Sequence, residues 1–155
     1  MVRFPESGRG IERFGKRDSY SLNGVQGKHG DNWADPFYAA AVFNAVQDYL
    51  YFSREYRNDV PLRYNDISAY DPSISLGHQT HNAGTDIDFR YMGKDGRPVD
   101  NIFQMDPVRQ AVFSIMLEMN GATRQYSYHA QVPDTKHAPG HYGHEHSGWN
   151  PWLKK

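Results

Sequence analysis

The stretch GHQTHNAGTDID, residues 77–88, decides how the middle of this chain folds. It places His78 and His81 before a glycine, and Asp86 and Asp88 after it. From Asp86 onward the sequence DIDFRY alternates polar and apolar residues, which predicts a half-buried strand with both carboxylates on one face. Imidazole and carboxylate groups are the ligands of a catalytic zinc site, which keeps one coordination position open. The stretch supplies half of such a site and needs a third ligand from elsewhere.

The composition limits the classes of protein to consider. The chain has 155 residues, which suits one domain, and a formal net charge of −1 with neutral histidines. This charge gives no electrostatic footprint for nucleic acid or an anionic membrane, so we expect neither as a partner. The absence of cysteine excludes disulfides and thiolate metal sites. No apolar run is long enough for a membrane span, and the N-terminus lacks the apolar segment of a signal peptide.

Local signals predict a single α+β domain with a small central antiparallel sheet flanked by helices. Asp35-Pro36 and Asp106-Pro107 each combine a capping residue with a proline suited to a first helical turn. The expected elements are helices over 36–56 and 107–119 and strands over 60–67, 86–91 and 123–128. Residues 1–35 are polar and glycine-rich, which predicts a long irregular N-terminal arm of the same domain, with its body in 36–155.

Apolar spacing indicates which face of the second helix is buried. Apolar residues recur there at three- and four-residue intervals, as they do on the inner face of an amphipathic helix. The expected buried stripe is Val108, Ala111, Val112, Ile115, Met116 and Met119.

The sequence GHYGHEH, residues 140–146, offers the missing third ligand. If this segment is extended, His144 and His146 project to the same face because strand side chains alternate. One imidazole can then coordinate the metal while the other lies beside it. A turn at Gly84 would bring His81 near Asp88, and pairing in the sheet would add the C-terminal ligand. The sequence therefore predicts a site assembled from two distant segments.

Together these two segments resemble the signature of a zinc-dependent peptidoglycan peptidase superfamily, which includes lysostaphin, D-Ala-D-Ala dipeptidases and murein endopeptidases. The matching patterns are His81-x-x-Gly84-x-Asp86-x-Asp88 and His144-x-His146. The chain is most similar to the penicillin-insensitive murein endopeptidases, because it also has His78 and the pattern Gly-His-x-x-His-x-His over 140–146. It departs from the usual flanking aromatic and arginine residues at Glu145, Ser147 and Gly148, which bears on substrate preference.

The resemblance implies a role for each of these residues. His81, Asp88 and His146 would bind one Zn²⁺ per chain, and His144 would be the general base. His141 and His78 would be cleft residues that hold substrate or stabilise the tetrahedral intermediate, with hydrogen-bonded loop histidines as the alternative. Asp86 lies on the same predicted strand face as the aspartate ligand. It can accept the free N–H of a ligating histidine, with a turn cap as the alternative.

We expect, from the resemblance, a zinc metallopeptidase that hydrolyses a D-amino-acid-containing peptide bond in peptidoglycan, such as the D-Ala–diaminopimelate cross-link. Two alternatives stay open: a D,D- or L,D-carboxypeptidase or dipeptidase of the same superfamily, and a non-catalytic metal-stabilised module that binds cell wall. The expected partners are peptidoglycan stems or cross-links, with an immunity protein if the enzyme is a delivered toxin. Such an enzyme acts in the periplasm or at the cell wall, as a mature form, a phage lysin or a secreted effector.

Overall fold

A computed structural model of the chain describes residues 1–14, 20–22, 25–27, 32–53, 60–65, 67–68, 81, 84–128, 132 and 135–149. Its centre is an eight-stranded sheet with the strand order β11-β10-β12-β8-β7-β3-β2, in which β9 pairs with β8. The strands are β2 (Ser7–Gly8), β3 (Ile11–Arg13), β7 (Leu62–Tyr64), β8 (Asp86–Met92), β9 (Pro98–Val99), β10 (Arg124–Ser127), β11 (Lys136–His137) and β12 (His144–Gly148).

The α+β class is confirmed, but the sheet differs from the prediction in size and strand direction. It is larger than expected, and it is mixed, because β3 pairs with β7 and β10 pairs with β11 in parallel. The N-terminal arm is also more regular than expected. Its described residues contain β2 and β3 of the main sheet, and Phe4 and Ile11 are buried in the core.

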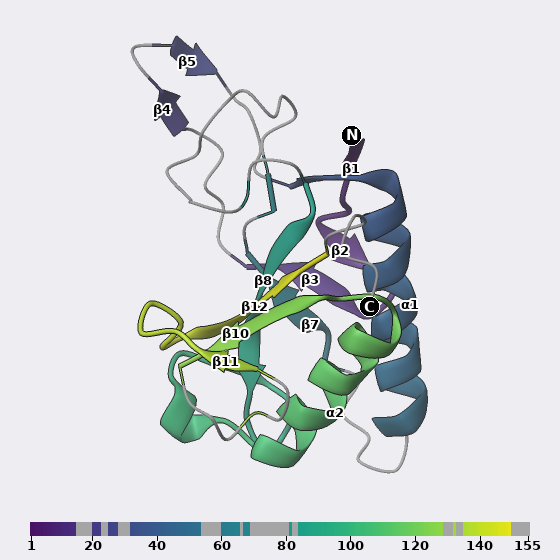
Figure 1. Ribbon diagram of the computed structural model, residues 1–155, viewed down its shortest axis with the longest axis vertical. Helices are drawn as coiled ribbons and strands as arrows, with labels where there is room; N and C mark the ends of the chain where they lie inside the picture. Colours follow the sequence, from purple (N-terminus) through teal and green to yellow (C-terminus); the bar gives the residue numbers. More distant parts are fainter. Residues whose placement is uncertain are drawn as a thin grey trace.

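The remaining N-terminal strands form two small pairs. The first joins β1 (Val2–Arg3) to β6 (Trp33–Ala34), and the second joins β4 (Tyr20–Leu22) to β5 (Val25–Gly27). The β4–β5 pair lies away from the body of the domain (Figure 1). The described part of the first 35 residues therefore combines strands of the main sheet with two separate strand pairs.

The two helices begin where their Asp-Pro signals predict. In α1 (Pro36–Phe52) the Asp35 carboxylate accepts backbone hydrogen bonds of 2.8 and 3.1 Å, and in α2 (Pro107–Met119) Asp106 accepts bonds of 2.9 and 3.0 Å. Such caps satisfy N–H groups that the first helical turn leaves unpaired. The second helix has the predicted bounds, whereas the first ends before residue 56. A short 3-10 helix (Ile102–Gln104) precedes α2.

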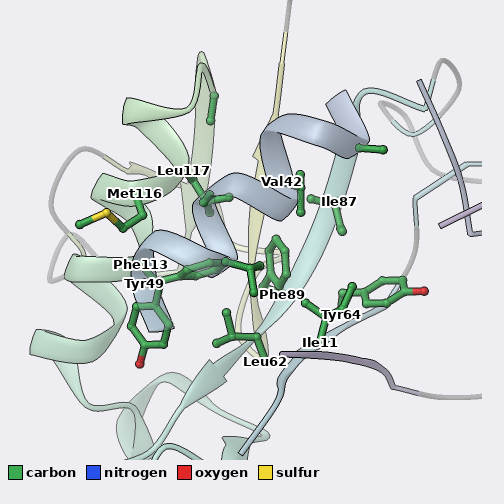
Figure 2. Close-up of a cluster of buried hydrophobic side chains, with 14 of the residues drawn as sticks. Ile11, Val42, Tyr49, Leu62, Tyr64, Ile87, Phe89, Phe113, Met116 and Leu117 are labelled. Atoms are coloured by element: carbon green, nitrogen blue, oxygen red, sulfur yellow. The ribbon is translucent and has the colours of Figure 1, made fainter. Parts of the chain in front are cut away.

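Both helices pack on the same face of the sheet, so the helices do not flank it on two sides (Figure 1). Figure 2 shows the resulting core, in which Phe89 of β8 lies between Phe113 of α2 and the residues of α1. The rings of Phe89 and Phe113 are 4.8 Å apart in an edge-to-face contact. Among the described residues, neither helix is long and apolar enough to cross a membrane.

The buried face of α2 is only partly the one predicted. Met116 is buried and Val112 packs partly buried against the core, as expected, but Val108, Ile115 and Met119 are 63%, 38% and 72% exposed. The other buried positions are Gln110, Phe113, Ser114 and Leu117. Two polar residues lie on this face because they bind Glu145 of β12: its carboxylate accepts hydrogen bonds from Gln110 (2.6 Å) and Ser114 (2.7 and 2.8 Å).

The pairing of β8 with β12 determines what the other face of the sheet carries. In this antiparallel pair His146 lies opposite Asp88, and His144 lies opposite Arg90. Because strand side chains alternate, Ile87 enters the helix-covered core while these polar residues project to the opposite face. The helices therefore cover one face of the sheet, and the polar residues gather on the other face.

Candidate metal centre

His81, Asp88 and His146 form a buried group whose potential ligand atoms all lie within 4.8 Å of one another. They come from three places: a turn before β8, β8 itself, and β12 at the C-terminal end of the described chain. The described residues thus contain one cluster of histidine and carboxylate side chains close enough to hold a metal ion.

The two histidines direct ring nitrogens at the same oxygen atom. Oδ1 of Asp88 lies 2.9 Å from Nδ1 of His146 and 3.4 Å from Nε2 of His81. The other nitrogen of His81, Nδ1, lies 2.9 Å from the carbonyl oxygen of Ile67 and donates to it. This backbone contact fixes the ring orientation and leaves Nε2 for the cluster.

Asp86 is fully buried and contacts His146 on the side of the ring that faces away from Asp88. Its Oδ1 atom accepts a hydrogen bond of 3.0 Å from Nε2 of His146, the nitrogen that faces away from Asp88. Arg124 of β10 binds the same carboxylate at 2.9 and 3.2 Å, and the hydroxyl of Thr85 donates to it at 3.0 Å. Asp86 therefore holds the ring of His146 in place.

The electrostatics of the cluster favour a positive charge between the rings and the carboxylates. Burial opposes charge on each group, but hydrogen bonds from His146 and His81 outweigh it and hold the pKa of Asp88 well below its usual range. In the same way burial is outweighed at His146, where Asp86 and Asp88 raise the pKa to about 9. Burial is likewise outweighed at His81, whose pKa is raised by Asp88. In the metal-free protein, protons on the histidine rings supply this positive charge. A metal cation would take their place on binding.

His144 stands at the open side of the cluster. Its Nε2 atom is 3.7 Å from Oδ2 of Asp88, and its side chain is 25% exposed, against 4% for His146. Burial lowers the pKa of His144, and the nearby Arg90 cation lowers it further although Asp88 acts in the opposite direction. The imidazole is therefore neutral at neutral pH and able to accept a proton.

His141 lies next to this histidine, on the loop before β12. Its ring centroid is 4.9 Å from that of His144 and 5.6 Å from that of His146. Burial lowers its pKa, as do the two neighbouring histidines. Its buried Nδ1 atom has no hydrogen-bond partner among the described residues, so the ring has polar capacity left beside the cluster. His78 lies outside the described residues.

Sequence reasoning missed two side chains that shape the site. Arg124 is the cation that binds Asp86, and its position on the polar face of the predicted 123–128 strand was the available signal. Tyr126 lies on the same strand. It lies opposite His146 in the sheet, with its ring 5.7 Å from that of His146 and 5.9 Å from that of His141.

This donor set fits a metal ion. Two imidazoles and one carboxylate make three ligands, their remaining polar atoms are held by Ile67 and Asp86, and His144 lies at the side left open. The three-residue cluster can thus bind a metal ion. A scan against models of known protein families gives no match for this chain, and no curated protein matches it significantly.

Proposed function

We propose that this protein is a zinc-dependent peptidase that hydrolyses a peptide bond in peptidoglycan, most simply the cross-link between D-alanine and diaminopimelate. The observation that carries the proposal is the combination of a buried three-ligand group, His81, Asp88 and His146, with a neutral histidine 3.7 Å from the ligand Asp88. Two histidines and a carboxylate are a frequent ligand set of hydrolytic zinc sites. The resemblance of the two motifs to murein endopeptidases supplies the substrate class.

Each residue has a part in this proposal. His81, Asp88 and His146 would hold the zinc ion, which would supply Lewis-acid activation of water and of the scissile carbonyl group near neutral pH. His144 takes a proton from the attacking water at Nε2 and returns it to the leaving amine. His141 offers the unpartnered Nδ1 atom to the charge that develops on the carbonyl oxygen. Asp86 keeps the imidazole of His146 oriented.

The alternative of a metal-binding module without a catalytic function leaves some residues of the site without a role. Such a module needs the three ligands and the support from Asp86, but it has no use for a neutral imidazole at the open side of the cluster. His144 and His141 lie together there, with ring centroids 4.9 Å apart. This second pair of histidines supports hydrolysis over binding alone.

The test is digestion of purified cross-linked muropeptides, with product identification by mass spectrometry and zinc content measured on the same samples. We expect conversion of dimers to monomers that stops on addition of a chelator and returns with zinc. His81→Ala and Asp88→Ala should lose both zinc and activity. His137→Ala is the matched control, because His137 lies exposed on β11 and hydrogen-bonds the Tyr128 carbonyl outside the cluster.

Three results separate the outcomes. Full hydrolysis by either ligand variant would refute the metal assignment. Removal of terminal residues from uncross-linked stems, without cleavage of dimers, would indicate a carboxypeptidase of the same superfamily. Zinc binding with no hydrolysis of any muropeptide would support a binding module.

A further inference from the structure

Arg90 occupies the third polar position of β8, after Asp86 and Asp88. It projects to the same face as these two residues, and in the antiparallel register it lies directly opposite His144. Residues opposite each other in such a pair have Cα atoms about 4.5–5.5 Å apart. The base of the arginine side chain is therefore adjacent to the histidine that we assign as general base.

The guanidinium of Arg90 is held in place but not neutralised. It lies over the ring of Phe14 at 4.5 Å, and its Nη1 atom donates a long hydrogen bond of 3.4 Å to the carbonyl oxygen of Gly143. Its buried Nε atom has no hydrogen-bond partner in the described part of the chain, and no described carboxylate lies within 4.0 Å of it. An arginine carries five N–H donors, so most of its capacity is open.

Other arginines on this face are already paired with carboxylates. Arg124 binds Asp86 at 2.9 Å, and Arg63 binds Glu12 at 3.1 Å. Arg90 therefore differs from both within the described residues. Two contacts position it without removing its charge: the ring beneath it, and the loop around Gly143, where an added Cβ would lie 3.0 Å from Nη1 of Arg90.

We infer that Arg90 is a specificity-determining residue that binds a carboxylate on the leaving half of the substrate, next to the amide nitrogen that is released. A fixed guanidinium with free donors is suited to a carboxylate, which it can bind through two parallel hydrogen bonds. The inference rests on the proposed hydrolytic function. It adds that the amine product carries a free carboxylate on the carbon that bears its new amino group.

The position of the leaving nitrogen follows from the proton transfer. In hydrolysis the water oxygen bonds to the carbonyl carbon, the C–N bond breaks, and the proton that His144 took from the water passes to the nitrogen. That nitrogen must therefore lie beside His144, and an α-carboxylate on the leaving amine lies only two bonds farther. Arg90, on the neighbouring strand position, is the described cation within reach. Both a C-terminal amino acid and the cross-linked centre of diaminopimelate present this carboxylate.

The experiment compares paired substrates that differ in one group, a carboxylate or a carboxamide beside the scissile amide. One pair is a cross-linked dimer and the other is an uncross-linked stem peptide, which separates the two sources of the carboxylate. Wild-type protein should prefer the carboxylate in at least one pair by about 10- to 100-fold in kcat/KM. Arg90→Gln should lose this preference by slowing the carboxylate substrate alone, and Arg90→Lys should keep part of it.

Arg97→Gln is the matched control, because Arg97 is an exposed arginine in the turn after β8 that pairs with Asp95 at 3.7 Å. It should retain the full preference. Equal slowing of both substrates by Arg90→Gln would indicate a structural role and overturn the inference. So would a wild-type enzyme that hydrolyses carboxylate and carboxamide at equal rates.

A binding measurement separates this inference from the proposed function. Calorimetric titration of the diaminopimelate-containing product peptide needs no turnover, and the peptide is used with its carboxylate free or amidated. Tighter binding of the free acid by wild-type protein, lost in Arg90→Gln, supports carboxylate binding even if zinc-loaded protein hydrolyses nothing. Equal binding of acid and amide would overturn the role of Arg90 even if hydrolysis is observed.

Discussion

Replacing Asp86 by asparagine tests whether the centre depends on the residue beneath its ligands. Asn keeps the size of the side chain and an oxygen that can accept the 3.0 Å hydrogen bond from Nε2 of His146. It removes the negative charge that raises the basicity of this ring, and it deprives Arg124 of a carboxylate 2.9 Å away. The substitution therefore weakens the electrostatic support of one ligand while it preserves the shape of the site.

The expected loss follows from the contacts. Removing the carboxylate that holds a metal-binding histidine typically costs 10- to 100-fold in metal affinity, which corresponds to about 1.4–2.8 kcal/mol. The loss should lie toward the upper end, because Asp86 is fully buried. Without metal, the variant should also be less stable by about 1 kcal/mol, because the hydrogen bond from His146 then ends on a neutral amide oxygen in place of a charged carboxylate.

The assay is competition for zinc with a chromophoric chelator at pH 7, together with urea unfolding of the metal-free protein. Asp48→Asn is the control. It is the same substitution at a carboxylate that accepts 2.9 Å from Asn120 and links the two helices away from the cluster. If Asp86→Asn binds zinc within twofold of the wild type while Asp48→Asn does the same, our account of how His146 is supported is wrong.

Three further predictions concern the base, a buried acid and the core. His144→Gln should keep about one zinc per chain but lose at least about 100-fold in turnover, since general-base catalysis contributes about that much; a parallel loss of zinc and rate would contradict its assignment. Burial raises the pKa of Glu145 from 4.5 to about 7, so the folded metal-free protein holds a proton that the unfolded chain releases. Stability should therefore fall as pH rises from about 4.5 to 7, and urea unfolding of metal-free Glu145→Gln should lack this part of the decline. Phe113→Ala should cost about 3–5 kcal/mol in urea unfolding because the ring is fully buried, whereas Met119→Ala, at a 72% exposed position, should change stability by less than about 0.5 kcal/mol.

The parts of the fold that were predicted correctly have local causes. Each helix start depends on an Asp-Pro pair that caps and orients its own first turn, so no distant residue was needed to find it. The same is true of β8, whose alternation of Asp86, Ile87 and Asp88 is visible within a few residues. Patterns confined to one element can be interpreted from sequence because the physics that produces them is local.

The wrong predictions have distant causes. Part of the buried face of α2 was misassigned because Gln110 and Ser114 look like surface residues until their partner Glu145, on another element, is known. The prediction that the N-terminal residues are irregular missed β3. This strand is short, and it gains its hydrogen bonds from β7, at residues 62–64. A single sequence gives no direct sign of such long-range pairing.

The candidate site was predictable in its ligands and less so in its surroundings. His81, Asp88 and His146 were grouped on the resemblance of their two motifs to a peptidase family, and the structure brings the three side chains together. The contact between Arg124 and Asp86 depends on the place of β10 in the sheet, beside β12 and one strand away from β8. Motif resemblance points to the candidate ligands, whereas their support follows from strand order.

The carboxylate of Glu145 has a consequence for how β12 finds its place. A strand that slips by one residue turns every side chain to the opposite face of the sheet. Such a slip would drive the polar rings of His144 and His146 into the apolar layer beneath the helices and leave Gln110 and Ser114 without their acceptor. Only one alignment satisfies both faces together. The hydrogen bonds of Glu145 on the helix-covered face thus favour the strand register that places His144 and His146 on the opposite face, and they do so before any metal binds.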